Sequence, residues 1–480
     1  MSQKSSTAGP RPEVGDGDGW RDLFGPAARG PVTVFAGGVA LYAINVYLTT
    51  SLLPSAVAEI GGLELYAWAM TVFLIASVIT SMLVSRTLTR FGPRTSYWIA
   101  LGLFGAGSLV ATFAPTMPVL LAGRGLQGLG GGLLAGLAFA VIRMVQPERL
   151  WKRSLGLTSA MWGIGNVVGP VLGGIFAQFG AWRGAFLLLA ICSAGIALLA
   201  KRAMPARTPD SGSTTPGRVP TLSLVLLTLA TTAVSIASVV GLSVIMVVLI
   251  AVAVILVIGF VVAERRGGAQ VLPAGTFRRG SVLIWLYLAV AVLAITSTVE
   301  AFLPLFGQRI GGLSPLGAGL LGASLSWGWS VAAILNSGIS RPAATRVARL
   351  AGPILVAVGL AGYTALQLEG AAPVRIGLWF VLLFVAGAGI GMSLVHWMPA
   401  VMSISADPTE SQQAAAGVNT VQLISNAFGS ALAGLLVGIG GPAIIGSAQL
   451  LGYGYAVVGV LALVVAARAL RTRALRTDGK

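Results

Sequence analysis

The chain has 480 residues, of which 56% are hydrophobic and only 9% carry a charge. Soluble domains carry about 25% charged residues, so this composition excludes a soluble globular protein and predicts an integral membrane protein. The net charge of +17 does not indicate nucleic-acid binding, because the basic residues lie in short segments between apolar runs, where they orient a protein in the membrane.

The first half of the chain predicts a tail and one helical bundle. Residues 1–30 hold Gly, Pro, Ser and charges of both signs without an apolar core, which is typical of a disordered cytoplasmic tail and not of a cleaved signal peptide. Six apolar runs of membrane-spanning length then predict an N-terminal six-helix bundle over residues 31–200. The runs are Pro31–Leu53, Tyr66–Val84, Tyr97–Phe113, Pro118–Val141, Leu155–Phe176 and Gly184–Ala200.

The centre of the chain separates two halves. Residues 201–220 are rich in Ser, Thr, Pro and Arg and predict a flexible cytoplasmic linker. From Thr221 to Ala263 the chain carries no charge, and at about 1.5 Å per residue this run is close to two membrane thicknesses. Residues 221–264 therefore predict two additional transmembrane helices with a turn at Gly241, and a cytoplasmic loop follows over 265–280.

The second half repeats the pattern of the first. Residues 281–467 predict a C-terminal six-helix bundle, and residues 468–480 a basic cytoplasmic tail. The six runs are Ser281–Leu303, Leu316–Gly338, Leu350–Leu366, Ile376–Met402, Gln413–Gly438 and Gln449–Ala467. The expected fold class is an all-α membrane protein of fourteen spans in the order six, two, six. Two bundles joined by a linker also predict a substrate site between them near the midplane.

The distribution of basic residues predicts the orientation of the chain. With a cytoplasmic N-terminus, the inside segments hold 26 of the 31 Lys and Arg residues; Arg183, Arg309 and Arg375 lie outside, and Arg124 and Arg143 lie within a span. This bias follows the positive-inside rule for short loops. We therefore expect a multi-pass protein of the cytoplasmic membrane with both termini in the cytoplasm.

The stretch from Gly156 to Gly174 carries a row of small residues. Gly165, Gly169 and Gly173 recur every four residues, with Pro170 and Gly174 beside them, and they predict a groove that another helix backbone can approach closely. We expect the groove to face a second row with the same spacing, made of Ala318, Gly322, Ser326 and Ser330. The alternative is that these glycines only reflect the high glycine content of membrane helices.

This glycine stretch resembles the antiporter motif on the fifth span of the major facilitator superfamily, specifically of its fourteen-span drug:proton antiporter branch. The resemblance runs from about Pro31 to Ala467. It implies two six-helix bundles plus two central helices, and a monomer that exports amphipathic or cationic small molecules by alternating access. It also implies that the proton gradient supplies the energy without a cofactor, and that small residues on this helix control how the bundles seal and rock.

A second motif lies in the fourth span, where Arg124, Gln127, Gly128 and Gly130 resemble a superfamily signature. An arginine two turns into a span is costly unless it faces water, a partner or a substrate. The resemblance implies that Arg124 lines the cavity and assists a proton relay. A structural arginine bonded to backbone carbonyls is the alternative, and both interpretations remain open.

Two positions depart from the pattern that the resemblance implies. Thr89 and Asn45 stand where the family carries aspartates. The amide of Asn45 cannot carry a proton, and Thr89 lacks the charge for the cytoplasmic latch between the bundles that the resemblance implies. Tyr42, Asn45 and Thr49 still share one face of the first span, since they are three and four residues apart. They are candidates for contacts with substrate, and interhelical hydrogen bonding is the alternative.

Two titratable residues inside apolar runs are candidates for proton coupling. Glu300 is the acidic residue that lies within a span, and a carboxylate held away from water indicates a functional site. Its place near the end of the span also fits an ordinary interfacial glutamate. His396, the only histidine, titrates in the physiological range, and a hydrogen-bonded packing role is the alternative.

Further polar and aromatic residues are candidates for the cavity wall. Each has a plainer alternative, as interhelical hydrogen bonding for the polar residues and as ordinary core packing for the aromatic ones. The candidates are Gln127, Trp162, Asn166, Trp327, Asn419, Gln422 and Asn426.

Several kinds of chemistry are not encoded. The sequence has no phosphate-binding GxxxxGK[ST] loop, no cluster of metal ligands and one cysteine, Cys192, so we expect neither an ATP-driven pump, nor a metal site, nor an enzyme. The sequence predicts a proton-driven exporter whose partners are the bilayer, protons and amphipathic substrates. An exporter of a lipid, siderophore or metabolite with weak or no proton coupling is the alternative, and a membrane scaffold or sensor is a third.

Overall fold

The structure is a computed structural model of the 480-residue chain, and it describes ten stretches of it. These are residues 23–25, 28–146, 148–206, 220–266, 272–273, 276–277, 280–368, 370–402, 408–441 and 443–472. Most of the two predicted tails, most of the linker and much of the predicted loop over 265–280 lie outside them.

The described residues contain fourteen helices that are long and apolar enough to cross a membrane, so the predicted number of spans is confirmed. Six of them form the first helix group, and a one-turn 3₁₀ helix, η1 (Leu63–Leu65), precedes the second of these. The six are α2 (Arg29–Ile60), α3 (Trp68–Ser81), α4 (Val84–Thr112), α5 (Met117–Val145), α6 (Glu148–Gln178) and α7 (Trp182–Ala203).

Two further helices follow, and then the second helix group. The additional pair is α8 (Thr221–Val240) and α9 (Val244–Arg266), and Gly241 between them has a φ of +71°, which supplies the expected turn. The second group supplies the remaining six spans, and the first of these combines α10 (Val282–Ser297), η2 (Thr298–Phe302) and α11 (Leu303–Arg309). The other five are α12 (Pro315–Asn336), α13 (Pro342–Ala365), α14 (Pro373–Met402), α15 (Pro408–Ile439) and α16 (Ile444–Arg471).

Two predicted segments have a different local structure. The stretch after α3, expected as a loop, is helical, and its break is confined to Gly92, where φ is +75° before Pro93. The run Ser281–Leu303, expected as one helix, is interrupted by η2, and α11 continues to Arg309. Glu300 therefore lies on a tight 3₁₀ turn and not in the middle of an α-helix.

Helices pack closely within each group because glycines remove side chains at their crossings. A Cβ on Gly130 of α5 would lie 2.4 Å from the Ala100 carbonyl oxygen of α4, and one on Gly387 of α14 would lie 1.8 Å from the Leu325 carbonyl oxygen of α12. In lipid, such close backbone packing holds helices together, since hydrophobic burial gives little drive there.

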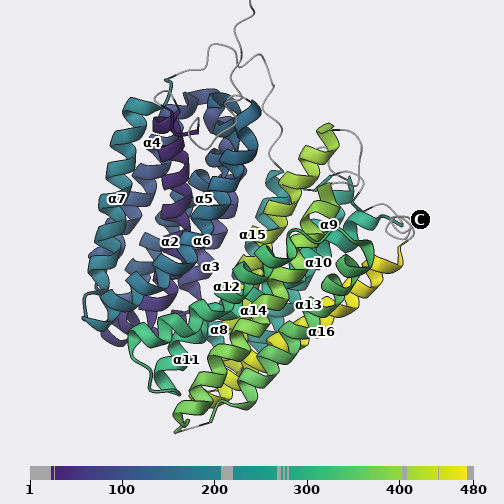
Figure 1. The fold of residues 1–480 in the computed structure, drawn as a ribbon. Helices are drawn as coiled ribbons and strands as arrows, with labels where there is room; N and C mark the ends of the chain where they lie inside the picture. Colours follow the sequence, from purple (N-terminus) through teal and green to yellow (C-terminus); the bar gives the residue numbers. More distant parts are fainter. Residues whose placement is uncertain are drawn as a thin grey trace, which may run out of the picture.

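Figure 1 shows the two groups inclined to one another, with α2 to α7 on one side and α10 to α16 on the other. They meet at the end where α2 stops and α3 begins, which we call the α2–α3 end. There the Tyr66 and Phe302 rings are 4.9 Å apart, and Gly174 of α6 lies against Leu316 of α12. Helix α8 packs on α15 and also reaches α3, so the additional pair is joined to both groups.

Candidate functional site

A buried hydrogen-bond network surrounds Arg124 of α5, whose side chain is 0% exposed. The guanidinium donates to the Ala69 carbonyl oxygen of α3 at 3.0 Å, the Asn45 Oδ1 of α2 at 3.0 Å and the Gln127 Oε1 at 2.8 Å. It also lies 4.3 Å from the centre of the Phe73 ring. All of these partners are neutral.

The network continues to the neighbouring helices. Gln127 Nε2 donates to Ser108 Oγ of α4 at 2.9 Å, and Thr49 Oγ1 donates to Asn45 Oδ1 at 3.5 Å. Asn45 Nδ2 is buried without a partner. Arg124, Asn45, Thr49 and Gln127 thus lie inside the first helix group in this conformation and bond to one another, as the interhelical alternative describes. A role in a proton relay or in substrate contact stays a prediction for them.

Tyr42 and Trp162 belong to an aromatic cluster that reaches the second group. The Tyr42 ring lies 5.5 Å from the Trp162 ring of α6 at an angle of 73°, and 5.4 Å from the Phe73 ring of α3. Ala427 of α15 packs into the same cluster. The candidate pair Tyr42 and Trp162 is therefore brought together, at a place where helices of both groups come into contact.

Asn166 and Trp327, also predicted candidates, form a direct link between the groups. Asn166 Nδ2 on α6 donates to Ser330 Oγ on α12 at 3.0 Å, and Trp327 Nε1 donates to the Asn166 carbonyl oxygen at 3.1 Å. These two bonds attach one turn of α6 to one turn of α12.

Glu300 of η2 bonds to α12 one helical turn before Ser330, at Ser326. Ser326 Oγ donates to Glu300 Oε2 at 2.7 Å. The Tyr47 side chain of α2 lies close to both Glu300 and Ser326. The single ion pair found in the described part of the chain joins Glu59 to Arg183, so Glu300 has no basic partner there. A carboxylate with neutral neighbours from both groups lies at their boundary.

The glycine row faces a different helix from the one expected. A Cβ on Gly165 would lie 2.5 Å from Ala43 Cβ, and one on Gly173 would lie 2.4 Å from the Leu48 carbonyl oxygen, so the row packs on α2. The expected opposite row is therefore wrong as the partner of Gly165, Gly169 and Gly173, which pack on α2. In that row, Ala318 lies against Gly307, Gly322 lies against Pro304, Ser326 bonds to Glu300, and Ser330 bonds to Asn166 of α6.

The neighbouring face of α6 makes the contacts with α12. Asn166, Pro170 and Gly174 are also four residues apart, each one position after a member of the glycine row. Gly319 of α12 approaches the Pro170 carbonyl oxygen, and Gly174 approaches Leu316. One stretch of sequence thus serves two interfaces, because positions one residue apart on a helix point in directions about 100° apart.

The remaining candidates are not brought to Glu300. His396, near the end of α14, is 8% exposed, its carbonyl oxygen accepts from Arg349, and its Nε2 has no partner. On α15, Asn419 is exposed and Asn426 is half-buried with an unpartnered Oδ1. Gln422, between these two, is half-buried. Their assignment to the cavity wall stays a prediction.

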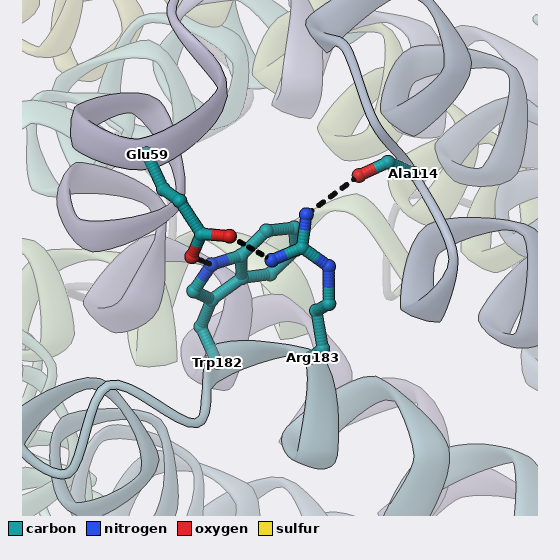
Figure 2. Close-up of polar contacts among 4 residues, drawn as sticks. All are labelled: Glu59, Ala114, Trp182 and Arg183. Carbon is teal, nitrogen blue, oxygen red and sulfur yellow. Dashed lines mark hydrogen bonds and ion pairs between the residues drawn. The ribbon is translucent and has the colours of Figure 1, made fainter.

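A polar cluster that the sequence did not indicate fastens the α2–α3 end of the first group (Figure 2). Glu59 of α2 accepts from Trp182 Nε1 at 2.6 Å and pairs with Arg183. Arg183 also donates to the Ala114 carbonyl oxygen at 3.0 Å and lies 4.2 Å from the Trp182 ring centre. The available signal was one acid and one base at the same predicted side of the membrane. The cluster ties the end of α2 to the α4–α5 connection and to the start of α7.

Comparisons with known proteins agree with this architecture. The family model described as Major Facilitator Superfamily matches residues 35–421. A probable multidrug-efflux transporter of Mycobacterium tuberculosis is 43% identical over 422 residues, which cover 87% of this chain and 89% of that protein. An uncharacterized MFS-type transporter of the same organism is 27% identical over 425 residues, which cover 86% of this chain and 60% of that protein.

Solved structures share the fold at low sequence identity. A bacterial homolog of the human lysosomal transporter Spinster, in an inward-facing and occupied conformation, superposes with a TM-score of 0.65 at 14% identity and covers 93% of this chain and 98% of its own. A D-xylose–proton symporter superposes with a TM-score of 0.62 at 17% identity, with 93% and 98% covered.

Proposed function

Because the chain belongs to the major facilitator superfamily and is a membrane transporter of its drug-efflux type, we propose that it exports amphipathic or cationic small molecules by alternating access, driven by proton entry. The 43% identity to a probable multidrug-efflux transporter supports the export of drug-like molecules. The proton coupling rests on a separate observation within the chain itself.

The observation that carries the coupling is the position of Glu300. It lies at the boundary between the helix groups, with Ser326 from one group and Tyr47 from the other beside it. The other carboxylates whose side chains the structure describes are placed elsewhere: Glu59 is paired with Arg183, Glu64 is exposed at the α2–α3 end, and Glu264 bonds to Ser223 Oγ at the end of α9.

A carboxylate in this position makes proton binding and cation binding mutually exclusive. An ionised group away from bulk water is costly, so it gains stability by binding either a proton or a cationic substrate. Exchange of one for the other as the groups rock is antiport. Ser326 supplies one hydrogen bond to the ionised oxygen, which holds the carboxylate in place between the two groups.

The other candidate residues act in this proposal by fixing α2. The glycine row packs α2 on α6, the Arg124 network bonds it to α3 and α5, and the Glu59 cluster fastens its end. A rigid α2 presents Tyr47 to Glu300 at a constant position. In this role Arg124 is a positioning residue.

The orientation of the chain follows from its charges. Cytoplasmic termini make the α2–α3 end the outer end, where the two groups are in contact, and the protein is then inward-facing. His396 and the first half of α15, with Asn419 and Gln422, then lie toward the cytoplasmic side, where substrate enters, and Asn426 lies just past the middle of α15. The protein works as a monomer in the cytoplasmic membrane with no cofactor.

The test uses purified protein in liposomes with an acid lumen and ethidium as the cation. We expect ethidium to accumulate inside and protons to leave the lumen in step with it. Glu300→Gln is expected to bind ethidium measurably but more weakly, because the counter-ion is lost, and not to move protons. Glu264→Gln, which changes a buried carboxylate away from the boundary, keeps both activities. Absence of ethidium uptake in wild type, or normal proton movement in Glu300→Gln, would contradict the proposal.

A second function is favoured by Asn45. Because Asn45 and not an acid lies 3.0 Å from Arg124, the first group lacks the charge pair that the antiporter resemblance implies. Export of a lipid, siderophore or metabolite with weak or no proton coupling accommodates this neutral pair. Transport that continues unchanged after a protonophore is added identifies this second function.

A further inference from the structure

A cleft of about 220 Å³ lies at the α2–α3 end, on the junction of three parts of the molecule. Its walls come from η1 and the start of α3 in the first group, from the end of α8, and from η2 and the end of α15 in the second group. This volume is below the roughly 300–1,000 Å³ of sites for drug-sized ligands. It accommodates a fragment such as a single ring with a short polar head.

The wall of this cleft is mainly apolar and aromatic, with one charge. Tyr66 and Phe302 line it, and their rings lie 4.9 Å apart at 35°. Glu64 also lines it, is exposed, and forms no hydrogen bond or ion pair with the described residues. An apolar cleft with a free carboxylate is complementary to a small lipophilic cation.

Tyr66, one of the lining residues, also carries an unsatisfied polar group. Its side chain is 2% exposed, and its hydroxyl has no hydrogen-bond partner in the described structure. A buried polar group without a partner costs free energy, and a ligand that supplies the missing bond recovers it. An ammonium N–H is a donor for the hydroxyl oxygen and a counter-ion for Glu64 at once.

We propose that this cleft binds a small aromatic or lipophilic ammonium ion, with Glu64 as its counter-ion and Tyr66 as its hydrogen-bond partner. The site is distinct from the transport site, since Glu300 is not among its lining residues. It takes its ligand from the side of the membrane that the α2–α3 end faces.

An occupant of this cleft touches parts that separate when the α2–α3 end opens. Around the cleft, Trp68 Nε1 donates to the Ser235 carbonyl oxygen at 3.1 Å, and Gly438 lies against the Ser238 carbonyl oxygen. A ligand that binds only while these contacts are made stabilises the closed state by linkage. Binding therefore inhibits transport without competing for the central site.

The experiment measures binding of protonated N,N-dimethylbenzylamine to the purified full-length protein by ligand-observed NMR. Glu64→Gln is expected to weaken binding about threefold or more, because an ion pair is lost. Tyr66→Phe, which keeps the ring against Phe302, is expected to weaken it by roughly two- to tenfold. Benzyltrimethylammonium, which has no N–H, is expected to bind equally to wild type and Tyr66→Phe.

Two control variants separate the site from general effects. Glu59→Gln removes a carboxylate at the same end but outside the cleft, and Tyr453→Phe removes the hydroxyl of an exposed tyrosine on α16, so neither is expected to change binding. The Glu300→Gln variant is expected to bind the amine like wild type. Wild-type affinity in both Glu64→Gln and Tyr66→Phe, or no saturable binding to wild type, would overturn the proposal.

A transport measurement tests the consequence for the closed state. The amine is expected to lower the maximal rate of ethidium efflux in wild type and to have a smaller effect in Glu64→Gln. Inhibition that is competitive with ethidium and equal in both proteins would show that the amine acts at the central site. Since the NMR measurement needs no transport, a failure of the proposed function leaves the outcome for the cleft readable.

Discussion

Replacement of Gly169 by Ala tests how closely α6 approaches α2. The added Cβ would lie 2.7 Å from Tyr47 Cβ and 3.0 Å from the Ile44 carbonyl oxygen, whereas ordinary contact begins at 3.4 Å. The closest pair is therefore short by 0.7 Å (3.4 − 2.7), and two rigid helices must separate to admit the methyl group. Overpacking of this kind costs about 1–3 kcal/mol.

The same substitution has a helix-propensity term that opposes the clash. Ala in place of Gly in a helix interior is favourable by about 1 kcal/mol. Gly163 of α6 supplies the control, because it lies on the same helix and a Cβ there would meet nothing within 4 Å. The difference between Gly169→Ala and Gly163→Ala therefore isolates the clash at about 1–3 kcal/mol.

Thermal unfolding of the purified variants, followed by intrinsic fluorescence, measures this difference. Gly169→Ala is expected to unfold at a temperature roughly 1–3 °C below that of Gly163→Ala, because the unfolding entropy scales with chain length. Because Tyr47 moves with α2, proton-driven ethidium uptake is also expected to fall in Gly169→Ala and not in Gly163→Ala. Equal unfolding temperatures for the two variants would show that no backbone approaches Gly169, and the packing argument for α2 would then fail.

Three further substitutions test the other contacts of this region. Asn45→Asp is expected to raise the unfolding temperature, since a carboxylate beside Arg124 forms a charge-assisted bond worth roughly 1.5–3 kcal/mol and the lost Nδ2 has no partner. Asn426→Asp, which gains no such pair, is the control. A lower unfolding temperature for Asn45→Asp would contradict the network. Trp182→Phe removes the donor to Glu59 and is expected to cost about 0.5–1.5 kcal/mol in the same assay, and an unchanged unfolding temperature would mean that the cluster does not fasten α2. Gly174→Ala places a Cβ 2.7 Å from Leu316 Cα and is expected to open the α2–α3 end. The opening is expected to lengthen the distance between spin labels at Leu63 and Val239. An unchanged distance distribution would contradict the contact between Gly174 and Leu316 as a closing contact.

Much of the fold was predictable, because membrane spans are encoded by length and hydropathy alone. Each apolar run must satisfy its backbone hydrogen bonds within one helix, so a run of sufficient length predicts one span. The turn at Gly241 was predictable for a similar reason, since glycine adopts a positive φ without strain. The 3₁₀ turn at Glu300 was missed although the sequence carries a signal for it, because Pro304 has no N–H to bond to the carbonyl oxygen of Glu300 four residues earlier.

The neighbours of each helix were less predictable than the helices themselves. The spacing of Gly165, Gly169 and Gly173 indicates that a helix approaches closely, but it contains no information on which helix that is. Arg124 was recognised as a buried charge from its depth in a span, whereas its bond to the Ala69 carbonyl oxygen depends on how α3 and α5 pack. The Glu59 cluster joins three connections that are far apart in the sequence.

The contacts of α2 and α12 assign different tasks to the two helices. Helix α2 is bonded to α5 and packed on α6 within its own group, and it reaches the second group where Ser51 lies against Gly319 of α12. Helix α12 carries Ser326 and Ser330, which bond to Glu300 and Asn166 on successive turns, and only the second of these bonds crosses the boundary. In the proposed mechanism, a proton or cation at Glu300 acts on the same face of α12 that holds the two groups together. We propose this adjacency as the route by which the charge at Glu300 biases opening and closing, and Gly174→Ala perturbs the closed contact without touching the carboxylate.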